Sequence, residues 1–314
     1  MPQNTNDINQ MLVSRIDEFA HSLQVERNAS AHTIRNYTVD LQDFARWAER
    51  SHIDPLHPTH RQLRRYLANL DAAQYARTTI NRRLSSLRSF YRWQIQVGYS
   101  DVNPAEALAS LKRDKTLPHR IRPDEMTRIL HVWGPTDNEG NARKQTPVMM
   151  RNQALLEMLY ACGARISEAS QLIVSNVDFS QMQIRLLGKG NKERIVPIHA
   201  LALQSMRTYW QDGRDQLAKQ GSSPYFFLST HGNQWSSDAM RKLFHETLVR
   251  AGVDDIYTPH DMRHTFASDV LEGGADLRSV QEMLGHSSLS TTQLYTHLNV
   301  STMLDTHHQA HPRG

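Results

Sequence analysis

The sequence predicts a mainly α-helical protein with two domains and one small antiparallel β-sheet. Its 314 residues are about the length of two ordinary domains. Apolar residues recur at helical spacing through the first hundred residues and again through most of the remainder. The pattern changes at residues 182–198, where two short β-prone runs flank a turn rich in glycine and lysine. We therefore expect an N-terminal helical domain and a C-terminal α+β domain.

Four amphipathic helices are expected in the first hundred residues. The first covers residues 12–23, and the second follows a predicted N-cap at Ser30. Thr59 begins a shorter third helix, and the fourth covers residues 78–97. Because short connections join these helices, they should form a compact bundle, which we assign to residues 1–103.

The fourth predicted helix also has a polar face. Its polar residues recur at helical spacing and include no acidic residue, whereas a solvated face usually mixes charges. They are Asn81, Arg82, Ser85, Arg88 and Arg92. This face fits an ordinary exposed surface and a helix that contacts DNA phosphates or bases equally well.

A basic linker is expected between the two domains. Residues 104–123 contain three prolines, which interrupt helices, and five basic residues that could follow a phosphate backbone. The basic residues are Lys112, Arg113, Lys115, Arg120 and Arg122. We assign the second domain to residues 124–299 and a C-terminal tail to residues 300–314.

The second domain should consist of helices and a β-hairpin. Residues 183–187 and 194–198 are the predicted strands, and a loop rich in glycine, proline and asparagine is expected over residues 133–147. The predicted helices cover residues 148–160, begin again near 165, and recur near 199–219, 236–251, 261–272, 276–284 and 289–295.

Positive charge is concentrated in one segment of the chain. The whole sequence carries 36 basic and 32 acidic residues, a formal charge of +4. Residues 51–120 hold 12 basic and 5 acidic residues, whereas residues 121–314 hold 19 and 20. All but seven of the basic residues are arginines. Arginine suits bidentate recognition of phosphates and guanine edges, although a GC-rich genome would also enrich it.

Membrane insertion and secretion are disfavoured by the sequence. It contains no run of about 18 apolar residues, and its polar start lacks the core of a signal peptide. Cys162 is the single cysteine, which excludes an intramolecular disulfide and a zinc site built from cysteines. We therefore expect a cytoplasmic protein.

Six polar residues stand at predicted helix starts, at turns or on helix faces. Glycine permits the turn before the first arginine and flanks the lysine on both sides. The first histidine lies three residues before the second arginine, on one helical face. In chain order they are Arg165, Lys189, His260, Arg263, His286 and Tyr295. Taken singly, each is more often structural: a solvated arginine, a turn lysine or a core tyrosine.

The order of these six residues resembles the catalytic signature of the tyrosine recombinases, the lambda-integrase-like phage integrase family, and most closely its Xer-type members. The likeness rests on residues 160–168 (YACGARISE), 187–197 (LGKGNKERIVP), 258–267 (TPHDMRHTFA) and 271–286 (LEGGADLRSVQEMLGH). The first hundred residues resemble the family's SAM-like core-DNA-binding domain. The resemblance implies that the two domains form a C-shaped clamp on DNA.

The resemblance also implies a covalent mechanism. Tyr295 would attack a backbone phosphorus, forming a 3′-phosphotyrosyl bond and releasing a 5′ hydroxyl, with His260 assisting the proton transfer. A lysine on the hairpin turn would protonate the leaving oxygen. The residues alone do not separate Lys189 from Lys192, but the family pattern favours Lys189, which lies between two glycines.

The remaining positive groups would stabilise charge or bind DNA. The resemblance implies that Arg165 and Arg263 clamp the non-bridging oxygens of the phosphate and that His286 donates a further hydrogen bond. Arg241 and Lys242 are additional candidates for contact with DNA. The mechanism needs no metal ion and no nucleotide, so no cofactor is expected.

The expected partner is a double-stranded DNA recombination site. In the family, the recombinases act as tetramers, so we expect a homotetramer or a heterotetramer with a second related recombinase. The tail should dock on a neighbouring subunit, with Met303 and Leu304 as apolar anchors. The expected role is resolution of chromosome or plasmid dimers at cell division, and a septal DNA translocase is a further expected partner.

Four other functions are compatible with parts of the sequence. A compact integrase of a phage or mobile element is the main alternative, because an integrase can share the same catalytic residues. A type IB topoisomerase and a non-catalytic DNA-binding protein are more remote. Seventeen histidines, with pairs four residues apart at His260 and His264 and at His307 and His311, suggest a metal-dependent hydrolase, but carboxylate partners are not evident.

Overall fold

The structure, a computed structural model, describes residues 5–26, 29–112, 119–136, 140–188, 192–218, 223–285, 307 and 309–313. The chain divides into two compact units, residues 1–116 and 117–314, and the division falls inside the segment expected to be a linker. Each unit has a hydrophobic core of its own. Within the described ranges, no helix combines the length and the apolar character needed to cross a membrane.

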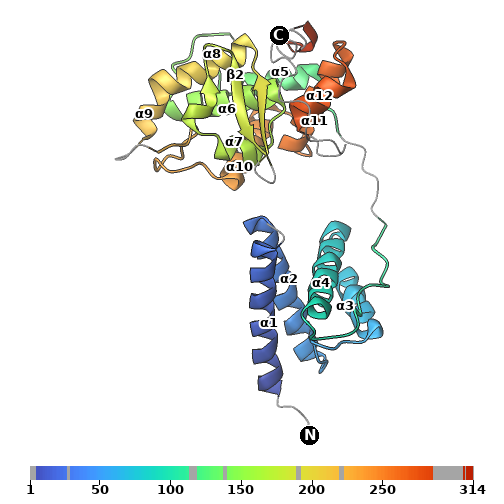
Figure 1. Ribbon diagram of the computed structural model, residues 1–314. Coiled ribbons are helices and arrows are strands. Elements are labelled where there is room, and N and C mark those ends of the chain that lie inside the picture. Colours follow the sequence, from blue (N-terminus) through green and yellow to red (C-terminus); the bar gives the residue numbers. More distant parts are fainter. Residues whose placement is uncertain are drawn as a thin grey trace. The chain divides into compact units, whose positions relative to one another are not determined.

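Four helices form the first unit: α1 (Thr5–Val25), α2 (Ala31–Arg50), α3 (His60–Ala72) and α4 (Arg77–Gln96) (Figure 1). Two of them begin at the predicted caps. Ser30 Oγ accepts a hydrogen bond from the Thr33 backbone at 3.2 Å, and Thr59 forms a capping box with Gln62. The predicted helical bundle is therefore confirmed.

Aromatic side chains fill the core of the first unit. The rings of Phe19 and Phe90 meet edge to face with their centroids 5.5 Å apart, and those of Phe44 and Tyr66 do so at 5.1 Å. Such a contact contributes about 0.5–1.5 kcal/mol beyond the burial of the rings. The first pair joins α1 to α4, and the second joins α2 to α3. The apolar side of α4 thus packs against α1.

The second unit is built around α6 (Pro147–Cys162), which is buried along the whole stretch from Arg151 to Cys162. A helix that is buried on every side is surrounded by protein. It packs against α8 (Ala200–Thr208) and α11 (Pro259–Glu272). Further helices are α5 (Pro123–His131), α7 (Ile166–Gln171), η1 (Val174–Asn176), α9 (Arg214–Leu217), α10 (Ser237–Ala251) and α12 (Leu277–Leu284).

A three-stranded antiparallel sheet completes the second unit, with strand order β1–β2–β3 (Figure 1). Strands β2 (Gln183–Leu187) and β3 (Glu193–Pro197) form the predicted hairpin, in which Ile184 lies opposite Val196. Both side chains are buried. Strand β1 (Val177–Asp178) was not predicted, because two residues are too few to show an alternating pattern.

The helix predicted over residues 199–219 is divided. Helix α8 ends at Thr208, and a single π-helical turn, η2 (Tyr209–Gly213), precedes α9. This turn carries the fully buried Tyr209, whose hydroxyl accepts a hydrogen bond from the Leu228 backbone at 3.1 Å. The helix expected near residues 289–295 lies outside the described residues.

Candidate active site

The turn between α6 and α7 fixes the backbone of Arg165. Gly163 ends α6 in the left-handed conformation, with φ of 57°. A Cβ atom at this position would lie 2.4 Å from Phe266 Cδ1, so the turn requires glycine both for its φ angle and for its space. Arg165 is then the N-cap residue of α7, as the sequence predicted.

A buried carboxylate holds the Arg165 side chain. Glu168 accepts hydrogen bonds from the backbone nitrogen and from Nη1 of Arg165, both at 2.8 Å. The same carboxylate binds Arg194 through two further hydrogen bonds. Burial would raise the pKa of Glu168, but the hydrogen bonds and charge of Arg194, together with the bonds from Arg165, outweigh it and lower the pKa. Arg194 was missed by the sequence analysis.

Helix α11 carries His260 in its first turn. Thr258 is the N-cap, and its Oγ1 accepts a hydrogen bond from the His260 backbone at 3.2 Å. The Asp261 carboxylate accepts one from the Thr258 backbone at 2.8 Å. This capping box fixes the start of the helix and therefore the position of His260.

Arg263 lies one turn after His260 and is buried, with 3% of its surface exposed. Its Nη1 donates to the carbonyl of Gly163, and its Nη2 donates to the carbonyl of Leu284. Burial, and next the charge of Arg165, lower the pKa of Arg263 to about 10. The guanidinium is still protonated at neutral pH, so the structure keeps a positive charge at the meeting point of α6, α11 and α12.

The fold brings Arg165 close to His260 and Arg263, which follow it by about a hundred residues in the sequence. Partial burial lowers the pKa of His260 below 6.5, and the charges of His264, Arg263 and Arg165 lower it further. Such charges act on a ring only when they are close to it. The His260 residue is itself exposed, so its ring is accessible to a substrate.

Three predicted catalytic residues, Lys189, His286 and Tyr295, lie outside the described residues. Their roles stay predictions. The residues that directly precede two of them are described: Gly188 follows β2, and Gly285 ends α12 in the left-handed conformation with φ of 64°.

The polar face of α4 binds the segment that follows the helix. The Asn81 side chain is buried and exchanges two hydrogen bonds with the Leu111 backbone, at 2.8 and 2.9 Å. Arg88 donates to the carbonyls of Ala105, at 3.2 Å, and Leu108. These contacts hold residues 103–112 along α4.

The other residues of this face also have partners within the first unit. Arg92 forms an ion pair with Glu106 at 3.2 Å, and Arg82 pairs with the buried Asp40 of α2. Ser85 donates to a carbonyl of its own helix at 2.9 Å. DNA binding by these five residues therefore stays a prediction.

Replacing Arg88 by alanine should loosen the segment at residues 103–112. The variant loses hydrogen bonds from a charged donor to backbone carbonyls, each worth about 1.5–3 kcal/mol. We expect a broad-specificity protease to cut this segment faster in Arg88→Ala than in the unaltered protein, with cut sites mapped by mass spectrometry. Arg64→Ala, a change at an exposed position of α3, is the control. Equal cutting rates in both variants would contradict the assigned role of Arg88.

Other positively charged residues that were predicted to contact DNA lie on α10 and in the linker. Arg241 and Lys242 both lie exposed on α10, where Arg241 pairs with Asp238. In the linker, Arg120 binds the carboxylates of Asp269, at 2.6 Å, and Glu272 on α11. Arg120 is therefore tied to the second unit.

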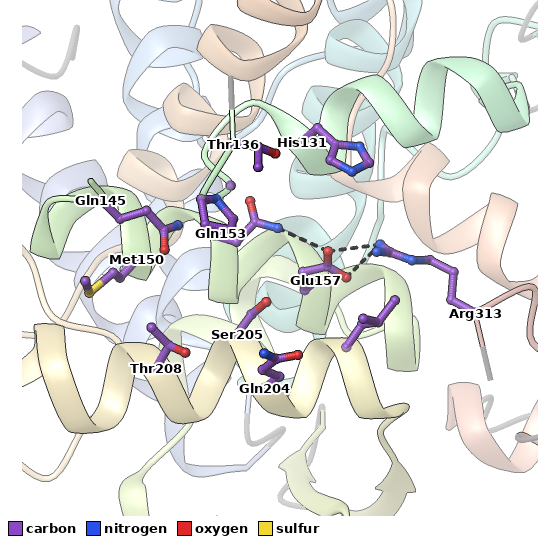
Figure 2. Close-up of a pocket in the computed structure, with 13 residues that line it drawn as sticks. His131, Thr136, Gln145, Met150, Gln153, Glu157, Gln204, Ser205, Thr208 and Arg313 are labelled. Carbon is purple, nitrogen blue, oxygen red and sulfur yellow. Dashed lines mark hydrogen bonds and ion pairs between the residues drawn. The ribbon is translucent and has the colours of Figure 1, made fainter. Parts of the chain in front are cut away.

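A cavity of about 230 Å³ opens between α6, α8 and the C-terminal segment (Figure 2). Glu157 in its wall forms an ion pair with Arg313 at 2.8 Å and accepts a hydrogen bond from Gln153 at 3.1 Å. The described residues that line it include none of the predicted catalytic residues. The cavity is thus separate from the described site residues Arg165, His260 and Arg263.

The described part of the tail binds the second unit of its own chain. His307 Nε2 lies 2.7 Å from the carbonyl oxygen of Ala161. A Cβ atom at Gly273 would lie 1.9 Å from the carbonyl oxygen of Ala310, so this glycine allows the tail to approach closely. The tail therefore covers the C-terminal ends of α6 and α11.

The histidine pairs that suggested a metal site do form ring contacts. The ring centroids of His260 and His264 are 5.1 Å apart, and those of His307 and His311 are 5.0 Å apart. In the described part of the chain, however, no three histidine, cysteine, aspartate or glutamate side chains are grouped so that they could hold a metal ion.

Comparisons with known proteins agree with the division of the chain into two units. Residues 119–302 match the phage integrase family, and residues 16–98 match the phage integrase N-terminal SAM-like domain. The chain is 38% identical over 304 residues to tyrosine recombinase XerC of Oceanobacillus iheyensis, covering 95% of this chain and 96% of that protein. It is 41% identical to XerC of Mycobacterium sp. strain KMS, covering 96% and 99%. It is 38% identical to tyrosine recombinase XerD of Staphylococcus aureus strain Mu50, covering 95% and 99%.

Solved structures share the fold. One is the XerH site-specific recombinase bound to its palindromic difH substrate, with a TM-score of 0.67, 21% identity and coverage of 89% of this chain and 80% of that chain. Another is a lambda integrase dimer bound to a core site, with a TM-score of 0.62, 17% identity and coverage of 91% and 98%. The chain therefore belongs to the phage integrase family, the tyrosine recombinases, which are enzymes of site-specific DNA strand exchange.

Proposed function

We propose that this protein cuts and rejoins DNA at a specific site through a 3′-phosphotyrosyl intermediate, as an Xer-type recombinase. The observation that carries the proposal is the meeting of Arg165, His260 and Arg263 on capped, buried elements. The identity to XerC and XerD proteins over almost the whole chain supports the subtype.

In the proposed first step, the Tyr295 oxygen attacks the scissile phosphorus, and the bond from phosphorus to the 5′ oxygen breaks. A phenol has a pKa near about 10, so it must lose its proton during the attack. His260 is exposed, and its lowered pKa keeps the ring neutral at pH 7, which suits a group that accepts this proton. Attack by a different 5′ hydroxyl on the phosphotyrosyl bond reverses the step and joins new partners.

The positive groups stabilise the charge that gathers on the phosphate. Arg165 and Arg263 bind the two non-bridging oxygens through charged, forked guanidinium groups. His286 donates a further hydrogen bond. Lys189 protonates the departing 5′ oxygen as general acid.

Cleavage should depend on pH through His260. The neutral ring is the active form, and its pKa lies below 6.5, so the rate should be level near neutral pH and should fall as the pH drops through that lowered pKa. Single-turnover rates measured from about pH 5 to 8 test this. His260→Gln should cleave more slowly and lose the acid limb. A wild-type rate that rises toward acid pH would contradict the assignment.

The proposed biological role is resolution of chromosome or plasmid dimers at cell division. Its substrate is a double-stranded recombination site bound by four protomers, either all of this chain or shared with a second related recombinase, and a septal DNA translocase activates the assembly. In that assembly the tail of one protomer docks on its neighbour. The tail contacts of His307 with Ala161 and of Arg313 with Glu157 define a surface that a neighbouring protomer also has. The predicted anchors Met303 and Leu304 lie outside the described residues.

A suicide-substrate assay tests the proposed function. Duplexes that carry candidate dimer-resolution sites are nicked beside the scissile phosphate, so that the released fragment diffuses away and the adduct accumulates. We expect adduct on a resolution site and none on shuffled DNA, with the protein alone or with a second Xer-type recombinase added. Equal adduct on shuffled DNA would indicate a topoisomerase instead, and no adduct on any site would overturn the proposal.

A further inference from the structure

Arg194 lies among the predicted catalytic residues, although no role was assigned to it. It stands on β3, and only 11% of its side chain is exposed. Its Nη1 and Nη2 donate to the two carboxylate oxygens of Glu168 at 2.8 and 2.7 Å, and its Nε donates to the carbonyl of Met283 at 2.8 Å. One guanidinium therefore joins β3, α7 and the end of α12.

The hydrogen bonds from Arg194 to Glu168 affect the position of Arg165. The Glu168 carboxylate, which is 3% exposed, is shared between Arg194 and the backbone and side chain of Arg165. A buried carboxylate is stable only when its charge and its lone pairs are matched. Without Arg194, Glu168 would have one arginine in place of two, and it would draw Arg165 away from the phosphate.

The second contact acts on the chain just before His286. Arg194 fixes the carbonyl of Met283, and Arg263 fixes the next carbonyl, that of Leu284. A Cβ atom at Gly285 would lie 3.0 Å from Arg194 Cδ, so glycine at this position lets the arginine lie against the helix end. The end of α12, which directly precedes His286, thus packs against Arg194.

Gly188, the residue just before Lys189, lies beside the same ion pair. The backbone nitrogen of Gly188 donates to the Lys192 carbonyl at 2.8 Å, which closes the base of the hairpin turn. A Cβ atom at Gly188 would lie 3.7 Å from Glu168 Oε1 and 3.8 Å from Arg194 Nη1. The backbone of Gly188 therefore lies beside the ion pair between Glu168 and Arg194.

We infer that Arg194 is a positioning residue that holds Arg165 and the backbone directly before two other predicted catalytic residues, Lys189 and His286. The inference rests on the proposed function of those three residues. It does not require Arg194 to touch DNA, because each effect passes through a residue that Arg194 or its carboxylate partner contacts. It also gives a reason for the near-complete burial of a charged side chain on β3.

Arg194→Lys is the informative variant, because it keeps the charge. One ammonium group cannot reproduce a fork that binds two carboxylate oxygens and a carbonyl together. A misplacement of about 1 Å can slow a reaction by about 10², and we expect a loss of that size in single-turnover cleavage. DNA affinity and the thermal midpoint should stay close to those of the unaltered protein. Glu168→Gln, which keeps the shape of the side chain and removes its charge, should show a similar loss of cleavage together with a lower thermal midpoint, because Arg194 then loses its buried partner charge.

A change of leaving group separates the three effects. When sulfur replaces the bridging 5′ oxygen of the scissile phosphate, the leaving thiolate needs no general acid, because a thiol has a pKa of only about 8.5. Lys189→Ala should then recover nearly full cleavage. Arg194→Lys should recover only in part, because the changes at Arg165 and at the end of α12 do not depend on the leaving group.

Arg185→Lys is the matched control, since Arg185 lies on the neighbouring strand, is half exposed and pairs loosely with Glu193 at 3.6 Å. It should cleave like the unaltered protein. Wild-type cleavage by Arg194→Lys would overturn the inference, and so would full recovery with sulfur, or a parallel loss of DNA binding and thermal stability. If the unaltered protein forms no adduct on a suicide substrate, the proposed function fails. If the unaltered protein and Arg194→Lys cleave at equal rates, only the inference about Arg194 fails.

Discussion

Tyr295→Phe is expected to bind a recombination site as tightly as the unaltered protein and to form no covalent adduct. The substitution removes one oxygen and keeps the ring, so packing and DNA contacts should change little. It removes the only atom that the proposed mechanism uses to attack phosphorus, and no neighbouring general base or acid can replace a missing nucleophile. Binding is measured by mobility shift, and the adduct is measured by denaturing gel electrophoresis with a suicide substrate.

Tyr257→Phe is the matched control for this experiment. Tyr257 also belongs to the second unit, and its hydroxyl donates to Glu125 at 3.0 Å, a residue outside the predicted catalytic signature. This variant should form the adduct at a rate close to that of the unaltered protein. A covalent complex with Tyr295→Phe would show that another residue is the nucleophile.

Arg165→Ala should slow cleavage by about 10²–10³, the range expected for loss of one donor to a transition-state oxyanion. Arg165 is a cleaner test than Arg263. Its side chain is 39% exposed, and Glu168 keeps both bonds to Arg194 when the Arg165 side chain is removed. Loss of Arg263 would also leave the buried carbonyls of Gly163 and Leu284 without their donor. Its effect would therefore mix stability with catalysis.

The decisive comparison is between cleavage and binding. Single-turnover cleavage by Arg165→Ala should fall by the stated factor, while its DNA affinity and thermal midpoint should stay near those of the unaltered protein. Arg165→Lys keeps the charge but loses the bidentate fork, so it should recover only part of the rate. Cleavage by Arg165→Ala at a near-normal rate would refute the role of this residue.

Helical spacing and capping residues predicted most of the fold. Ser30, Thr59 and the apolar positions of the first unit are local signals, and the structure uses them as expected. The π-helical turn at Tyr209–Gly213 was missed because it preserves the helical pattern on both sides. The buried hydrogen bond between Tyr209 and Leu228 at this turn joins residues that are 19 positions apart, so local sequence patterns do not reveal it.

The sequence predicted residues of the site but not the hydrogen bonds that hold them in place. Ordered motifs identified Arg165, His260 and Arg263, which the fold brings together. They did not reveal that Asn81 and Arg88 bind the segment after α4, because those partners depend on the path of a loop 17 to 30 residues away. Arg194 was missed for the same reason: Glu168 and Met283 meet it only in three dimensions.

The most direct test of the central claim is to identify the residue that carries the DNA. The protein is trapped on a suicide substrate in EDTA, the DNA is digested with nuclease, and the peptides are sequenced by mass spectrometry. The account predicts a nucleotide joined through its 3′ phosphate to Tyr295, formed without a divalent metal ion. A nucleotide on any other residue, a 5′ linkage, or an adduct that requires added metal would contradict it.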